Sequence, residues 1–168
     1  MKKIQTALIS VSDKKNLKPL LNSLKKNNIK IISSGGTYKE IKKLKFKCLE
    51  VSEFTNSPEI LEGRVKTLHP KIHAGILNKR KNKTHLKDLK KNNFENIDLV
   101  IVNFYPFEET LRNTKNHNKI IENIDVGGPT MVRSAAKNYK DVTVITSLNQ
   151  YKELIDELKI NKGFTSLK

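Results

Sequence analysis

The sequence is poor in the features from which disulfides, zinc clusters and membrane spans are built. Its 168 residues include one cysteine, Cys48, which excludes an internal disulfide and has no partner at a CxxC spacing. No apolar run approaches the roughly 18 residues that a membrane-spanning helix needs. The first residues, MKKIQTALISV, contain a short apolar run and no small-residue cleavage site, so we expect a core strand there and not a signal peptide. These absences predict a folded cytoplasmic protein without a membrane partner.

Acidic residues are also scarce beside basic ones, 17 against 33, which gives a formal net charge of +16. Such an excess is typical of nucleic-acid-binding proteins, because Lys and Arg release counterions from phosphate backbones. Here the basic residues are spread along the whole chain, in segments such as KKNLK, EIKKLK and NKRKNK, and no arginine-rich segment or zinc spacing accompanies them. We therefore interpret the basic residues as solvent-exposed side chains of the protein surface that also attract small anions, and we predict no specific nucleic-acid partner.

Short apolar runs alternate with segments of helical periodicity. The pattern predicts strands at 6–11, 29–32, 46–51, 98–103 and 142–146, and helices at 14–27, 37–44, 128–138 and 149–158. Near-continuous apolar strands separated by amphipathic helices are typical of a parallel sheet covered on both faces. The sequence thus predicts an α/β fold of three layers with a mainly parallel, Rossmann-like sheet, in which ligands bind outside the carboxyl ends of the strands.

The chain shows no repeat and no interdomain linker, so we expect residues 1–168 to form one domain. The charged, Asn-rich segments 79–91 and 112–119 are expected to be exposed. The final segment, 161–168, is expected to end without a closing element, as in a fragment of a longer protein.

Two of the predicted strands are followed by turns rich in hydroxyl groups and glycine. SVSDK (10–14) follows the first strand and SGGT (34–37) follows the second, and each opens a predicted helix. Helix starts and hydroxyl groups suit an anion, although N-capping by Ser12 or Asp13 also explains the first turn. SGGT has neither the Walker nor the GxGxxG spacing. GRVKTLHP (63–70) adds Arg64, whose planar fork can grip a phosphate, and Lys66, a compact titratable charge, so the three segments together favour a phosphate site.

Further polar residues lie at the ends of later elements. Asn103 and Tyr105 leave the buried strand 98–103, where aromatic packing is the alternative explanation. Asp125 precedes a Gly-Gly-Pro helix start, and from the sequence alone an N-cap is the better explanation for it. Lys137 lies near the end of a helix of small residues, a position at which lysine is usually solvated.

The sequence contains no convincing metal site. His69 and His73 are four residues apart, but Pro70 is expected to interrupt the helix that would bring them together, and the glutamate of an HExxH motif is absent. We assign neither histidine a chemical role, and we expect Cys48 to pack in the interior.

Six motifs, in order along nearly the whole chain, resemble the inosine monophosphate (IMP) cyclohydrolase domain. That domain is the N-terminal part of the bifunctional purine-biosynthesis enzyme that also carries a folate-dependent transformylase. The motifs are SVSDK (10–14), SGGT (34–37), GRVKTLHP (63–70), NFYPF (103–107), NIDVGGPT (123–130) and RSAAKN (133–138). GRVKTLHP and the last two motifs are the specific ones, whereas SGGT is common.

The resemblance implies a methylglyoxal-synthase-like fold and a defined reaction. The reaction is the dehydrative ring closure of 5-formamidoimidazole-4-carboxamide ribonucleotide (FAICAR) to IMP, the last step of de novo purine biosynthesis, catalysed by a hydrolase running in the cyclisation direction. It implies no metal or organic cofactor, since the folate belongs to the transformylase domain, which is absent from this chain. Family members form homodimers, largely through that absent domain, so a homodimer of this chain stays an open alternative.

The resemblance also implies roles for individual residues. Lys66, with Tyr105, stabilises charge on the formyl oxygen. Asp125 orients or deprotonates the carboxamide, and Lys137 is the proton donor and acceptor. The nucleotide is held by Ser10, Ser12, Lys14, Ser34, Gly35, Gly36, Thr37, Arg64, Thr67, Asn103, Val126 and Gly127.

Three other functions compete with this one. Methylglyoxal synthase shares the fold and a phosphate pocket, but its acid and histidine motifs have no equivalent here. A non-catalytic sensor, like the regulatory end of carbamoyl phosphate synthetase, has no use for Lys66, Tyr105, Asp125 and Lys137 together. A nucleic-acid binder is suggested by net charge alone.

Overall fold

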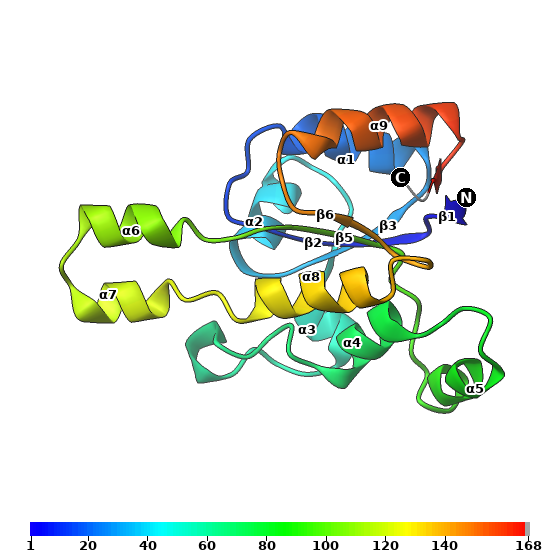
Figure 1. Ribbon diagram of the computed structural model, residues 1–168, viewed down its shortest axis with the longest axis horizontal. Helices are drawn as coiled ribbons and strands as arrows, with labels where there is room; N and C mark the ends of the chain where they lie inside the picture. Colours follow the sequence, from blue (N-terminus) through cyan, green and yellow to red (C-terminus); the bar gives the residue numbers. More distant parts are fainter. Residues whose placement is uncertain (167–168) are drawn as a thin grey trace.

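The centre of the molecule is a five-stranded parallel sheet, seen edge-on in the computed structural model, which describes residues 1–166 (Figure 1). Its strand order is β4-β3-β2-β5-β6. The strands are β2 (Thr6–Val11), β3 (Lys30–Ser33), β4 (Leu49–Glu50), β5 (Leu99–Asn103) and β6 (Thr143–Ile145). The chain builds one half of the sheet outward from β2 and then returns to its other side with β5, so the strand order reverses between these two strands. The predicted three-layer, mainly parallel α/β fold is confirmed.

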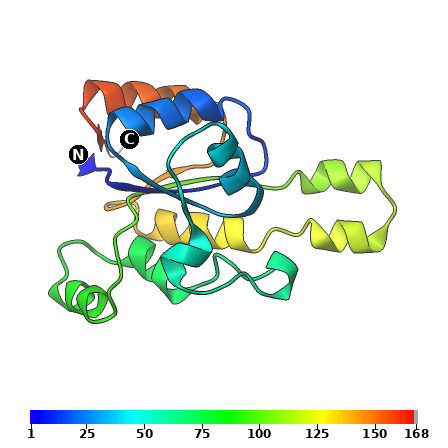
Figure 2. The same cartoon turned by 180° about the vertical axis from the view of Figure 1, so that it is seen from behind.

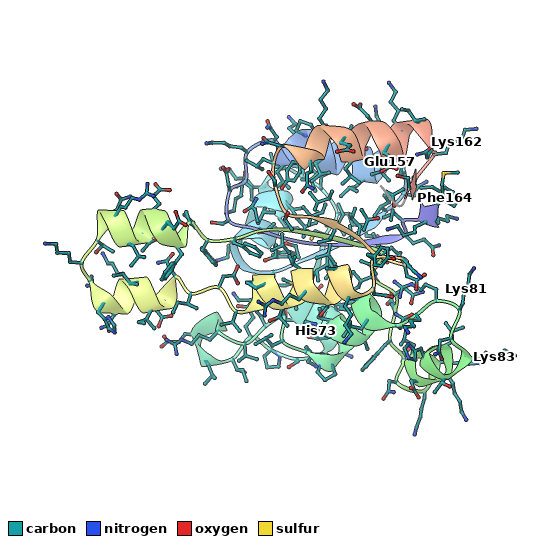
Figure 3. The ribbon with its side chains drawn as sticks, in the orientation of Figure 1. His73, Lys81, Lys83, Glu157, Lys162 and Phe164 are labelled. Atoms are coloured by element: carbon teal, nitrogen blue, oxygen red, sulfur yellow. The ribbon has the colours of Figure 1, made fainter. Side chains whose placement is uncertain are left out.

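Helices cover both faces of the sheet (Figures 1 and 2). One layer contains α1 (Leu17–Lys26), α2 (Gly35–Lys43) and α9 (Gln150–Ile160). The other contains α3 (Val51–Thr55), α4 (Pro70–Leu77) and α8 (Gly127–Lys137). A short helix, α5 (Lys83–Lys91), lies beyond α4, and there the side chains of Lys81 and Lys83 project away from the body of the protein (Figure 3).

The alternation of side chains along the central strands explains why two layers form. Ala7 and Ile9 of β2 pack with Leu20 and other residues of α1 and α9, whereas Leu8, between them, packs with Ile72 of α4 and the α8 side. Successive residues of a strand point to opposite faces. A strand that is apolar at every position therefore requires a helical layer on each side of the sheet.

Most predicted elements are present, with shifted ends. The helix predicted at 14–27 begins only at Leu17, because Asn16 adopts a left-handed conformation with φ of 56°. The strand predicted at 46–51 is reduced to β4, since Val51 already begins α3. Residues 83–91 of a segment predicted only to be exposed form α5, a helix in which Leu89 alone is buried.

The chain end differs from the prediction that it lacks a closing element. β7 (Phe164–Thr165) pairs antiparallel with β1 (Lys2–Lys3) at the amino-terminal side of the molecule. The hydroxyl of Thr165 also lies 2.7 Å from that of Thr143. The prediction for 167–168, the last part of that segment, concerns residues outside the described part of the chain.

The amino edge of the sheet is held by a buried ion pair. One oxygen of Asp98 accepts hydrogen bonds from the backbone N–H groups of Gln5 and Thr6, at 3.0 and 3.1 Å. Its other oxygen lies 3.3 Å from the Arg80 guanidinium, which also donates to the carbonyls of Asn78 and Ile97. This network fixes β5 beside β2 at the end of the sheet opposite the strands' carboxyl ends.

A helical hairpin extends from the carboxyl edge. α6 (Phe107–Asn113) and α7 (His117–Glu122) run out from the end of β5 and back to the start of α8 (Figures 1 and 2). We call residues 107–122 the arm. Among residues 1–166, no helix is both long and apolar enough to cross a membrane.

Candidate functional site

A cavity of about 640 Å³ lies at the carboxyl edge, where the segments that follow β2, β3 and β5 meet. This is the point at which the strand order reverses, the usual ligand position in open α/β sheets. The volume is in the range of small-molecule sites. Fifteen of the sixteen predicted site residues line it: Ser10, Ser12, Lys14, Ser34, Gly35, Gly36, Thr37, Arg64, Lys66, Thr67, Asn103, Tyr105, Asp125, Val126 and Gly127.

One end of the cavity is a helix start flanked by two lysines. Ser34 precedes α2 in an extended conformation, and its side chain does not cap the helix. A Cβ atom added to Gly35 would lie 3.3 Å from the ammonium of Lys66, and one on Gly36 would lie 3.8 Å from that of Lys14. Gly35 has φ of 54°, which side-chain-bearing residues rarely adopt. Two ammonium groups beside the positive end of a helix form a site for an anion.

The Thr37 side chain has a structural partner in this arrangement. Its hydroxyl donates to the carbonyl of Val11 and accepts from the N–H of the same residue, both at 3.0 Å. The side chain is 4% exposed. Thr37 therefore joins α2 to the end of β2, and its hydroxyl is already engaged at that strand.

Asn103 is engaged in a similar way at the end of β5. Its side-chain oxygen accepts from the N–H of Asp13 and its amide donates to the carbonyl of Asp13, both at 2.9 Å. Asp13 in turn accepts from the N–H of Lys15 at 2.9 Å. This bond lies within the turn and does not cap a helix, as the alternative explanation of this segment required, because α1 begins only at Leu17 with Asn16 at its cap position. Asn103 thus holds the segment that presents Ser12 and Lys14 to the cavity.

The opposite end of the cavity combines an acid with the start of α8. Asp125 accepts a hydrogen bond from the N–H of Gly128 at 2.8 Å, as an N-terminal cap does. A Cβ atom on Gly128 would lie 2.3 Å from the other oxygen of Asp125, and one on Gly127 would lie 2.5 Å from the Thr67 hydroxyl oxygen. The glycine pair is therefore what lets Asp125, Thr67 and the helix start converge on one space.

Two of the three cations that line the cavity are paired with acids of the chain. Lys66 lies 3.4 Å from a carboxylate oxygen of Glu59. Arg64 forms an ion pair with Glu122 of α7, which raises the pKa of Arg64 and lowers that of Glu122. Arg64 and Glu122 are 62% and 58% exposed in their side chains, so water and salt compete with their attraction. A bound anion can replace such a carboxylate beside the guanidinium.

Lys137 is the one predicted site residue that the structure does not bring to the cavity. It is the last residue of α8 and is exposed. Ten helical steps separate it from Gly127 at the cavity, which corresponds to about 15 Å along the axis. The prediction of a solvated lysine near a helix end describes its position correctly.

The two histidines have local roles. The prediction that Pro70 interrupts a helix is wrong, because Pro70 is the first residue of α4. The ring of His69 caps that helix by accepting a hydrogen bond from the N–H of Lys71 at 3.1 Å. His73, on the side of α4 toward α8, lies 3.1 Å from the hydroxyl of Ser134 (Figure 3). Burial lowers the pKa of His73.

Cys48 is half-buried against the core formed with α1 and α9, as predicted. Burial raises the pKa of its thiol to about 12. Within residues 1–166, no three His, Cys, Asp or Glu side chains gather in a way that could hold a metal ion.

Sequence reasoning missed several residues of the cavity wall, among them Glu62, Ile121, Glu122 and Ile124. No motif marks them, because they reach the cavity only through the course of the arm and of the turn at Leu61–Gly63. Charge complementarity predicts that some acidic residues lie opposite Arg64 and Lys66. The sequence alone does not show which of its acidic residues these are.

Comparisons with known proteins agree with this architecture. The family model described as MGS-like domain matches residues 16–130. The bifunctional purine biosynthesis protein PurH of Prochlorococcus marinus subsp. pastoris is 55% identical over 154 residues, and that of Acetivibrio thermocellus is 49% identical over 160 residues. These alignments cover 91% and 95% of this chain, and the chain spans only 30% and 31% of the relatives' length.

Among solved structures, the crystal structure of ForH superposes with a TM-score of 0.83 at 29% identity. The superposition covers 96% of this chain and 83% of ForH. The family match, which extends over most of the chain and includes the α2 helix start, Arg64, Lys66 and Asp125, establishes that this chain belongs to the MGS-like domain family.

Proposed function

We propose that this chain is an IMP cyclohydrolase that closes FAICAR to IMP with loss of water. The observation that carries the proposal is the convergence of fifteen dispersed residues on one cavity with an anion site at one end and an acid at the other. Two of the relatives are purine biosynthesis proteins, and the cyclisation is a step of that kind. As a hydrolase of nucleotide biosynthesis, it is expected to act in the cytoplasm.

The phosphate of the nucleotide fits the α2 end of the cavity. A phosphate monoester carries nearly two negative charges at neutral pH, and here it meets the start of α2 with Lys14 beside Gly36. Arg64 can exchange Glu122 for phosphate oxygens in the planar, two-pronged geometry that guanidinium groups favour. The base then extends toward Tyr105 and Asp125.

The reaction needs orientation and proton transfer more than new reactive groups. The carboxamide nitrogen attacks the formyl carbon of the same molecule, a bond forms between them, and the former formyl oxygen leaves as water. Because both groups belong to one substrate, much of the entropic cost of bringing them together is already met. Asp125 is placed to accept a proton from the nitrogen, while Lys66 and Tyr105 stabilise the negative charge that develops on the oxygen.

The departing oxygen also needs a proton. The resemblance implies Lys137 as its donor, which does not line the cavity of this structure. The ammonium of Lys66 and the phenol of Tyr105, the two groups assigned to the formyl oxygen, do line it and can supply the proton. The Glu59 carboxylate, 3.4 Å from the Lys66 ammonium, orients the side chain of Lys66 before substrate arrives.

An ultraviolet assay of IMP formation from FAICAR, with chelator and without folate, tests the proposal. We expect turnover by the unaltered chain and losses of about 10²-fold or more in kcat for Lys66→Ala and Asp125→Asn, as for typical acid–base residues. Lys140→Ala, which alters an exposed lysine outside the cavity, is the matched control and should stay within about threefold of the unaltered chain. Lys137→Ala tests the donor that the resemblance implies, and a large loss in kcat would assign the proton to Lys137.

The outcomes separate the competing functions. Near-normal turnover by Lys66→Ala or Asp125→Asn would overturn the assignment of the reacting groups. Nucleotide binding without turnover would favour a sensor, and conversion of dihydroxyacetone phosphate would favour a methylglyoxal synthase. Salt-sensitive DNA binding with no turnover would favour a nucleic-acid-binding protein.

A further inference from the structure

His73 is a partly buried ionisable side chain that the proposed reaction does not use. It lies on α4, on the side toward α8, and its Nδ1 atom is 3.1 Å from the hydroxyl oxygen of Ser134 (Figure 3). The other ring nitrogen, Nε2, is buried and has no hydrogen-bond partner in the part of the chain that the structure describes. Unpaired buried polar atoms are rare in folded proteins, so an imidazole at this position calls for an explanation.

The hydrogen bonds of Ser134 define the tautomer of His73. A hydroxyl group has a single proton to donate, and that of Ser134 goes to the carbonyl of Thr130, at 2.9 Å. The Ser134 oxygen therefore accepts from His73, which places the ring proton on Nδ1. Burial lowers the pKa of His73, and the nearby backbone of Thr67 offsets part of this effect. The ring is thus a neutral imidazole that donates to α8 through Nδ1.

The contact between His73 and Ser134 adds little to the stability of the fold. The gain from one hydrogen bond is offset by the cost of leaving a buried acceptor, Nε2, without a donor. Ser134 keeps its bond to the Thr130 carbonyl whether or not the imidazole is present. Ile72 of α4 and Met131 of α8 already join the two helices through the apolar core. An apolar side chain at position 73 would add to that packing without an unpaired polar atom.

The position of the contact relates it to the cavity, because α4 and α8 both begin there. Thr67, shortly before α4, and Asp125, shortly before α8, line the cavity wall. A Cβ atom on Gly127, the first residue of α8, would lie 2.5 Å from the Thr67 hydroxyl oxygen, so the two helix starts are in close contact. Ser134 lies seven residues further along α8, which corresponds to about 10 Å. The hydrogen bond from α4 therefore fixes the two helices to each other just behind the cavity wall.

We propose that His73 is a positioning residue for the cyclisation, a role that rests on the function proposed above. Its bond to Ser134 holds α4 in register with α8, and thereby sets the distance across the cavity between Lys66 and Asp125. Lys66 belongs to the segment that leads into α4, and Asp125 caps α8. These two groups act on the two reacting ends of one substrate, so a small change in their distance slows the chemical step. The phosphate end, with Lys14 and the start of α2, belongs to other elements and is unaffected.

Replacement of the imidazole by an apolar side chain of similar size separates positioning from stability. His73→Leu should lower kcat for FAICAR by about tenfold or more, because no hydrogen bond then fixes the helix register. It should melt at or above the temperature of the unaltered chain, since it removes an unpaired buried atom. The dissociation constant for IMP should change by less than about threefold. His117→Leu, which alters an exposed histidine of α7, is the matched control and should leave kcat unchanged.

Two amide side chains of different length test which ring nitrogen acts. His73→Asn places an N–H at the same number of bonds from the backbone as Nδ1, so it can donate to Ser134 and should restore kcat to within about threefold of the unaltered chain. His73→Gln carries the same amide one methylene further out, at the reach of Nε2, and should resemble His73→Leu. Heteronuclear NMR spectra of the imidazole report its tautomer without any substrate, and they should show the proton on Nδ1.

The outcomes separate this role from the proposed function. Absence of FAICAR turnover by the unaltered chain would overturn the proposed function and the positioning role with it. If the unaltered chain does turn over FAICAR, normal kcat in His73→Leu would overturn the role alone, and so would equal rescue by Gln and Asn at this position. A joint fall in kcat and melting temperature in His73→Leu would show that the contact is structural and would also overturn it. A ring proton on Nε2 would contradict the hydrogen bonding on which the role depends.

Discussion

The two edges of the parallel sheet hold their charged groups in opposite ways. At the amino edge, the ion pair of Arg80 and Asp98 is 18% and 9% exposed in its side chains, and every oxygen of Asp98 has a partner within the protein. At the carboxyl edge, Arg64 and Glu122 are paired but more than half exposed. Breaking a buried, fully hydrogen-bonded ion pair is costly because it leaves an unpaired charge in the interior. An exposed pair contributes little to stability, so one partner can readily be replaced by a ligand. The first arrangement stabilises the fold, and the second leaves a cation ready for a ligand.

The largest effect is expected from breaking the pair at the amino edge. Asp98→Ala removes the partner of Arg80 and of the N–H groups of Gln5 and Thr6, so we expect a loss of about 3–5 kcal/mol in the free energy of unfolding. Urea denaturation measures it. Asp88→Ala, an exposed aspartate on α5, should change stability by less than about 0.5 kcal/mol. Equal losses in the two variants would show that the buried network is not what stabilises this edge.

A smaller effect is expected where the fold positions the site. Asn103→Ala removes both hydrogen bonds to Asp13 and frees the segment that presents Ser12 and Lys14. We expect kcat/KM for FAICAR to fall about tenfold, mostly through KM, as for the loss of one to two hydrogen bonds. The exposed Asn22 provides the control, since Asn22→Ala should leave both constants unchanged. A fall in kcat at constant KM would instead mean that Asn103 contacts the reacting base.

The smallest effect is expected at the exposed pair. Glu122→Gln frees Arg64 from its carboxylate, so nucleotide monophosphate binding should tighten by about two- to fivefold, and less at high salt. Isothermal titration with IMP measures it. Glu108→Gln, which alters a glutamate paired only within α6, is the control and should bind as the unaltered chain does. Weaker binding by Glu122→Gln would show that the carboxylate orients Arg64 for the ligand.

Strand positions were predictable because a strand that is buried on both faces is a continuous apolar run in the sequence. β2 coincides with its predicted run, and β3, β5 and β6 lie within a residue or so of theirs. The short helices were not predictable in the same way. α6 and α7 have no buried face, so they carry no apolar stripe toward a core that a periodicity analysis can detect.

The site, too, was predictable in part. The motifs indicated which residues belong together, and fifteen of them do line one cavity. They did not indicate that Thr37 and Asn103 direct their side chains to the backbone of β2 and of the segment after it. The periodicity did place Lys137 near the end of its helix, but the motifs did not indicate that this end lies away from the cavity, since that depends on how α8 packs in the fold.

The sequence by itself determined the parallel sheet, the glycine-rich helix starts and the cations near them, because each depends on local pattern or on residue chemistry. Only the tertiary structure decided which acids face those cations and where the arm projects. Those contacts join residues as far apart as Arg64 and Glu122, and their pairing depends on the course of the whole chain between them.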